Sequence, residues 1–87
     1  MAKIEQKVKN ILLESFDEDE LQLEMNENGL LAGFIISSQF DDLDDLTRQK
    51  KIWNLLRKKI TKSERGEILG FIAFTPAEYE AYSEPSL

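Results

Sequence analysis

Carboxylates are the side chains of this sequence best able to do chemistry, because the usual catalytic residues are missing. The 87 residues include no histidine and no cysteine. These absences remove the common acid or base at neutral pH, the usual nitrogen and thiolate metal ligands, disulfides and cysteine nucleophiles. No nucleophile stands beside a base in a known motif, and no glycine pattern for a cofactor is present. We therefore expect no enzyme activity, no catalytic residues and no cofactor.

Two clusters of acidic residues are candidates for binding a divalent cation. Residues 17–20 lack calcium-loop spacing, because Leu21 and Gln22 stand where another ligand and the obligatory glycine are needed. The four aspartates between positions 41 and 45 have no phosphate-binding loop beside them, and they fit the acidic start of a helix. We predict a solvated turn at the first cluster, a helix start at the second and no metal site.

Basic residues gather in one segment and form a candidate partner-binding surface. Between Arg48 and Arg65 lie eight of the eleven basic residues and one acid, which gives this segment about +7 and the remainder about −13. On a helix, part of this set forms a stripe around Leu55, which we expect to be exposed: Arg48, Lys51, Lys58, Lys59 and Lys62. Three explanations stay open, namely a solvated face, docking of an acidic protein around an apolar anchor, and binding of nucleic acid.

Hydrophobic periodicity predicts the elements that position these residues. Apolar residues at helical spacing indicate a helix over residues 3–16, and alternation indicates an edge strand over 21–25. A turn at 26–29 leads to a strand over 30–36, whose two apolar faces place it in the middle of the sheet. A second helix begins at Asp42 or Asp44, with its core arc formed by Leu46, Gln49, Ile52, Trp53, Leu56 and Ile60.

The carboxyl-terminal part completes the pattern. A loop over residues 61–66 precedes a strand over 68–74. Thr75 and Glu78 then have the spacing of a capping box, which predicts a short last helix carrying Tyr79 and Tyr82. We expect one domain over residues 1–87, with an ordered core over about 3–82 and a tail over 83–87. No apolar run approaches the length of a membrane span and no secretory signal is evident, so we expect a cytoplasmic protein.

The predicted fold is α+β, an α/β sandwich in the order α-β-β-α-β-α. A right-handed crossover makes the third strand parallel to the second, which gives a three-stranded mixed sheet. Two segments carry a family resemblance, Ser37-Ser38-Gln39-Phe40 with the downstream Arg48-Gln49-Lys50, and Phe74-Thr75-Pro76-Ala77-Glu78-Tyr79. In order and spacing they resemble the BolA-like family, whose fold is similar to the class II KH domain. Asp42 stands where that family usually has glycine, and Tyr79 where it has tryptophan.

The resemblance implies a monothiol glutaredoxin as partner, with which BolA-like proteins share a two-iron cluster. The family holds that cluster through a histidine, which falls here on Glu67, and through a cysteine or histidine in the loop that here spans residues 25–29. Neither ligand is present, and carboxylates are poor ligands for an iron–sulfur centre. For nucleic-acid binding, the resemblance to KH domains would also require a Gly-x-x-Gly loop that clamps the backbone, and no such tetrad occurs in the chain.

These observations favour a non-catalytic BolA-like protein-interaction module, an adaptor or regulator without iron–sulfur ligands of its own. The competing interpretation is a divergent nucleic-acid-binding protein that uses the basic face of the second helix. The sequence does not identify the partner.

Overall fold

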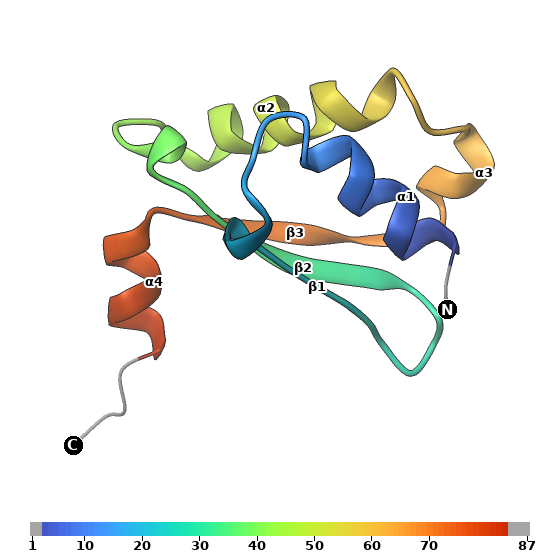
Figure 1. Cartoon of the computed structure of the whole chain (residues 1–87), viewed down its shortest axis with the longest axis horizontal. Coiled ribbons are helices and arrows are strands. Elements are labelled where there is room, and N and C mark those ends of the chain that lie inside the picture. Colours follow the sequence, from blue (N-terminus) through green and yellow to red (C-terminus); the bar gives the residue numbers. More distant parts are fainter. Residues whose placement is uncertain (1–2, 84–87) are drawn as a thin grey trace.

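Figure 1 presents the structure, a computed structural model that describes residues 3–83. The amino-terminal half contains the helix α1 (Lys3–Leu12), the 3-10 turn η1 (Glu18–Glu20), the strands β1 (Leu21–Met25) and β2 (Leu31–Ile36), and the 3-10 turn η2 (Ser38–Phe40). The carboxyl-terminal half contains α2 (Asp45–Arg57), the one-turn helix α3 (Lys62–Arg65), β3 (Ile68–Phe74) and α4 (Pro76–Ser83). None of the helices among the described residues is long and apolar enough to span a membrane.

The sheet has the predicted topology. Its strand order is β1-β2-β3, with β2 antiparallel to β1 and parallel to β3. The hairpin between β1 and β2 closes at Gly29, whose φ of 78° lies in the left-handed region, and Asn26 accepts hydrogen bonds from the backbone of Asn28 and Leu30. The predicted mixed sheet with a central second strand is confirmed.

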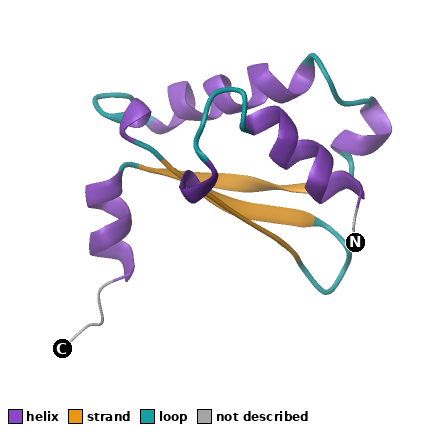
Figure 2. Cartoon of the chain, viewed as in Figure 1, coloured by secondary structure: helices purple, strands orange, loops and turns teal. Residues whose placement is uncertain are grey.

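Helices α1 and α2 cover one face of the sheet, whereas α4 lies near the end of β3, on the other side (Figures 1 and 2). The core fills the layer between the two helices and the sheet. Its fully buried members come from every layer: Val8, Leu12, Leu31, Ile35, Phe40, Ile52 and Leu56. The apolar stripe of the first helix was therefore identified correctly. Of the central strand, one face (Leu31 and Ile35) belongs to this core, while the other face is half-buried and packs through Phe34 against Tyr79 and Tyr82 of α4.

Three predicted boundaries are wrong. Helix α1 ends at Leu12 instead of residue 16, because the chain turns there and Phe16 packs against Phe40, with ring centroids 5.6 Å apart. The predicted loop over 61–66 contains α3, whose start is stabilised by a capping box between Thr61 and Glu64. Ser83 belongs to α4 instead of the predicted tail, and residues 84–87 lie outside the described residues.

The start of α2 shows where helical periodicity misplaced a side chain. Asp44 caps the helix by accepting a hydrogen bond from the Thr47 backbone at 2.8 Å, which confirms one of the two predicted starts. Leu46 is 64% exposed, so its placement in the core arc is wrong. Arg48 turns inward in its place, with its guanidinium carbon 5.9 Å from the centroid of the Phe40 ring.

The backbone conformation at Asp42 bears on the one position where the sequence has an aspartate in place of the glycine usual in the BolA-like family. Its φ is 63°, and among the described residues it is the one non-glycine with a positive φ. The left-handed region costs an L-residue energy that glycine does not pay, although aspartate tolerates it better than most residues. The chain therefore keeps, with an aspartate, a conformation that suits the glycine usual at this position.

Candidate functional site

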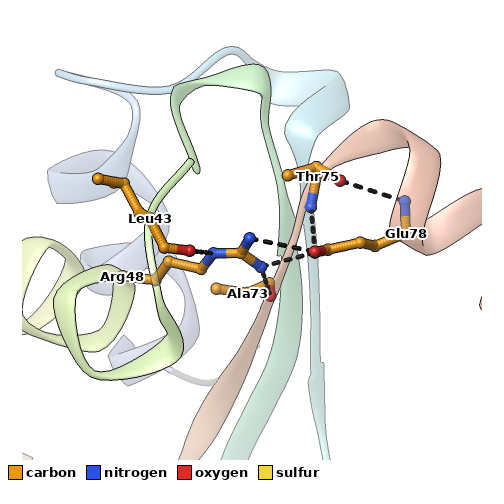
Figure 3. A network of polar contacts seen from close by, with 5 residues as sticks. All are labelled: Leu43, Arg48, Ala73, Thr75 and Glu78. Carbon is orange, nitrogen blue, oxygen red and sulfur yellow. Dashed lines mark hydrogen bonds and ion pairs between the residues drawn. The ribbon is translucent and has the colours of Figure 1, made fainter. Parts of the chain in front are cut away.

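Arg48, a candidate surface residue, lies at the centre of a polar network that joins α2, β3 and α4 (Figure 3). Its Nε donates to the Leu43 carbonyl at 2.8 Å, and one terminal nitrogen donates to the Ala73 carbonyl at 3.2 Å. The guanidinium also forms a bidentate pair with the Glu78 carboxylate at 2.6 and 3.1 Å. Only 11% of the Arg48 side chain is exposed. Its charge is thus directed inward, where it ties the start of α2 to the end of the sheet.

Glu78 has two roles in this network. Besides pairing with Arg48, its carboxylate accepts from the Thr75 backbone at 2.9 Å, while the Thr75 hydroxyl accepts from the Glu78 backbone at 3.2 Å. The predicted capping box of α4 is confirmed. The Arg48 hydrogen bonds, followed by the bond from Thr75, lower the pKa of Glu78 from 4.5 to about 2. The same pairing raises the pKa of Arg48.

The other members of the predicted basic stripe differ in their surroundings. Leu55 is half-buried and packs against the core, so the expectation that it is exposed is wrong. The Lys59 ammonium pairs with Glu14, and Lys62 lies on α3, beyond the end of α2. Lys51 and Lys58 are exposed and form no ion pair within residues 3–83. The turn between α2 and α3 separates Lys62 from the helical arc predicted for Lys51, Lys58 and Lys59.

A groove of about 550 Å³ lies between α2 and α3 instead, and it collects basic residues that the stripe left out. Its lining residues are Gln49, Lys50, Trp53, Arg57, Ile60, Thr61, Lys62 and Arg65. Of the predicted partner-binding residues, only Lys62 belongs to this set. We refer to this feature as the α2–α3 groove.

Trp53 forms the aromatic wall of the α2–α3 groove. One side of the indole packs on Phe71, with ring centroids 5.5 Å apart, and the Arg65 guanidinium carbon lies 4.1 Å from the Trp53 ring centroid. Arg65 also donates to the Ile68 carbonyl at 3.3 Å, and Gln49 donates to the Phe71 carbonyl at 2.9 Å. The interpretation of Trp53 as purely a core residue is therefore incomplete, because the half-buried ring also lines the groove.

The groove has an unbalanced positive charge. Lys50, Arg57 and Lys62 are exposed and form no ion pair with any described residue. Glu64 is the single acid of this basic segment, and Lys7 of α1 holds it at 2.8 Å and lowers the pKa of its carboxyl. The carboxylate of Glu64 is therefore paired with a lysine outside the groove and does not balance the positive charge of the groove.

Sequence reasoning missed three of the groove's cationic residues, namely Lys50, Arg57 and Arg65, for a specific reason. A helical projection of α2 alone places Lys50 and Arg57 beside the core arc, while the capping box that folds α3 back brings Arg65 onto Trp53. The signal that could have located the groove was the Thr61 and Glu64 spacing, which marks a helix start inside the presumed loop.

Glu67, at the position of the family histidine, lies beside the β1–β2 hairpin. Its carbonyl accepts from the Leu31 backbone at 2.8 Å. The side-chain oxygen of Asn26 in the hairpin is already committed to two backbone amides of the turn. Exposed carboxylates and amides make up the remaining side-chain donors here, and iron–sulfur clusters require thiolate or imidazole ligands. The donor set does not fit such a cluster, and residues 3–83 hold no group of three potential metal ligands.

Comparison with known proteins shows which solved structures share the fold of this chain. No protein-family model and no curated protein matches the sequence. Among solved structures, the chain is similar to BolA1 from Arabidopsis thaliana, with a TM-score of 0.66, 16% identity and coverage of 90% of this chain and 98% of that one. It is similar to a bol-like protein from Babesia bovis at a TM-score of 0.66 and 24% identity, covering 92% and 93% of the two chains.

The solution structure of BolA1 protein from Mus musculus is also similar, with a TM-score of 0.70, 15% identity and coverage of 99% of this chain and 76% of that one. All three similarities extend over nearly the whole of this chain. The fold is therefore BolA-like, as the two sequence segments indicated. At these identities the similarity defines the fold, and function must be inferred from this chain's own residues.

Proposed function

We propose that this protein is a divergent, non-catalytic BolA-like interaction module of the cytoplasm, acting as an adaptor or regulator. In this proposal the α2–α3 groove binds an acidic segment of a protein partner. The observation that carries the proposal is the combination of a half-buried aromatic wall, Trp53, with Lys50, Arg57 and Lys62, which lack acidic partners among the described residues. A central aromatic anchor with a charged rim is typical of protein interfaces.

Binding of a glutaredoxin through a shared cluster is not part of the proposal. Glu67 and the adjacent hairpin supply oxygen ligands, which do not suit an iron–sulfur centre. A glutaredoxin would remain a partner only through protein contacts with the groove.

Nucleic acid is the second candidate for the same groove. The stacking of Arg65 on Trp53 resembles the aromatic and cationic surfaces on which bases stack. Two features disfavour it. The net charge of −6 repels a phosphate backbone at long range, and the sequence has no Gly-x-x-Gly loop.

Two charge-reversal variants of equal net charge test the proposal. Arg57→Glu with Lys62→Glu reverses the groove, whereas Lys51→Glu with Lys58→Glu reverses two exposed lysines outside it. Each variant serves as bait in a cell extract, before and after nuclease treatment, with captured proteins identified by mass spectrometry. We expect the groove variant to lose the partner that the wild-type protein captures and the outer variant to retain it. Nuclease treatment should change neither result.

Two outcomes of this experiment contradict the proposal. Equal capture by the wild type and both variants would show that the groove does not bind the partner. Loss of all captured protein after nuclease treatment would indicate nucleic-acid binding instead, and a steep fall of oligonucleotide affinity with salt would support that conclusion.

A further inference from the structure

The two edges of the sheet differ in how the rest of the molecule covers them. β1 and β3 are the edge strands, because the order is β1-β2-β3. Along β3, three carbonyls accept hydrogen bonds from side chains of α2 and α3, at Ile68 from Arg65, at Phe71 from Gln49 and at Ala73 from Arg48. This edge is therefore blocked by helix side chains, which prevents another strand from pairing there.

The outer edge of β1 has no such cover. The Asn26 backbone amide donates to the Leu30 carbonyl at 2.8 Å, which fixes the hydrogen-bonded positions of the hairpin. Because these positions alternate along an antiparallel ladder, Glu24 and Gln22 also bond to β2, and the residues between them point their backbone groups outward. Leu23 and Met25 thus present amides and carbonyls for which the described residues supply no partner.

The side chains around this edge define what can pair with it. Toward the helices, Leu23 and Met25 are half-buried against the core and would be covered further by apolar residues of an added strand. On the opposite face, Glu24 is exposed, and Glu20 and Glu27 lie just beyond the two ends of β1. An added strand with alternating apolar and basic residues satisfies both faces.

We propose that the outer edge of β1 binds an extended segment of a protein partner by strand addition, with basic residues opposite Glu24 and apolar residues opposite Leu23 and Met25. This surface lies at the edge of the sheet opposite to β3 and goes beyond the function proposed for the α2–α3 groove. Backbone hydrogen bonds supply affinity in this mode, and alternate side chains supply specificity.

A second copy of the chain is the less suitable occupant. Antiparallel pairing of two β1 strands about Leu23 brings the acidic turn before β1 in one copy, with Glu18, Asp19 and Glu20, toward Glu27 in the hairpin turn of the other copy, at both ends of a symmetric dimer. Like charges brought together in this way repel each other. The acidic residues that repel a second copy attract a basic segment.

The test uses two synthetic peptides, one alternating valine with lysine and one alternating valine with glutamate. With isotope-labelled protein, we expect the lysine peptide to perturb the Leu23 and Met25 amide resonances and to slow their hydrogen exchange. Glu24→Lys should weaken lysine-peptide binding several-fold and allow the glutamate peptide to bind. The matched control is Asp45→Lys, which makes the same charge change at an exposed position of α2, the helix whose Gln49 bonds to β3 at the opposite edge, and should leave both affinities unchanged.

Three results would overturn the inference. An equal effect of Glu24→Lys and Asp45→Lys would mean that only net charge attracts the peptide. Amide protection at Leu23 and Met25 in peptide-free protein, together with dimers in sedimentation, would assign the edge to a second copy. Lack of any perturbation along β1 at saturating peptide would show that the edge accepts no strand.

Discussion

At the scale of single residues, Arg48 shows that a basic side chain in a positive segment can have an internal role. Its guanidinium donates to two backbone carbonyls and to Glu78, and therefore joins three elements that are distant in sequence. The count of charges in this segment does not distinguish the inward-directed Arg48 from Lys51, which lies three residues further along and is exposed. The distinction depends on tertiary contacts, which no helical projection contains.

Replacing Arg48 tests this structural role. Arg48→Ala leaves the carbonyls of Leu43 and Ala73 without their donors and should lower the free energy of unfolding by about 1–3 kcal/mol. The control Lys51→Ala removes the same charge from an exposed position and should change it by less than about 0.5 kcal/mol. Chemical denaturation measures both, and equal effects would mean that the network contributes nothing to stability.

Glu78 should make the protein sensitive to acid. Its pKa is about 2 in the folded protein, below the ordinary 4.5, so its ionised form stabilises the fold above pH 4.5. That stabilisation is lost as the pH falls from about 4.5 through about 2. Glu78→Gln should therefore show a smaller decrease of melting temperature over this interval than wild type. Parallel decreases in the two proteins would contradict the assignment.

Asp42 offers a stabilising change. Its φ of 63° suits glycine, so Asp42→Gly should relieve backbone strain and raise the free energy of unfolding by up to about 1 kcal/mol. Asp41→Gly is the control, because Asp41 has a negative φ of −56° and gains no relief. A decrease in stability for Asp42→Gly, measured by denaturation, would show that the aspartate side chain itself holds this turn.

At the scale of elements, helix α2 contributes to the core through its middle and carboxyl-terminal turns. Leu55→Ala should lower the free energy of unfolding by about 1–2 kcal/mol, because the side chain is half-buried against the core. Leu46→Ala removes the same atoms from a position that is 64% exposed and should have little effect. The sequence periodicity predicts the reverse order, so thermal melts of the two variants distinguish the two placements directly.

Most elements were predictable from the sequence, because their signals are local. Alternation located β1, two-sided apolarity made β2 central, and the Thr75 and Glu78 spacing located the start of α4. The candidate site was predictable only as a region of basic charge. Its actual shape depends on where α2 ends and how α3 turns back, and both features result from packing between distant segments.

At the scale of the whole molecule, charge is separated in space. The segment from Arg48 to Arg65 carries about +7 and contains all the residues that line the α2–α3 groove, while the remainder of the sequence carries about −13. In the proposed functions the basic groove takes an acidic segment and the acidic β1 edge takes a basic one. These two surfaces adjoin opposite edges of one sheet, so the two proposals are compatible in a single molecule.

Trp53 provides the most direct measurement of the central claim, because it is the single tryptophan of the chain and lies in the groove. We would follow its fluorescence during titration with a short glutamate-rich peptide that contains one central leucine, over a series of salt concentrations. We predict a saturable change in emission that weakens with salt, disappears in Arg57→Glu with Lys62→Glu and persists in Lys51→Glu with Lys58→Glu. An unchanged emission at saturating peptide, or an equal response of both variants, would contradict the account.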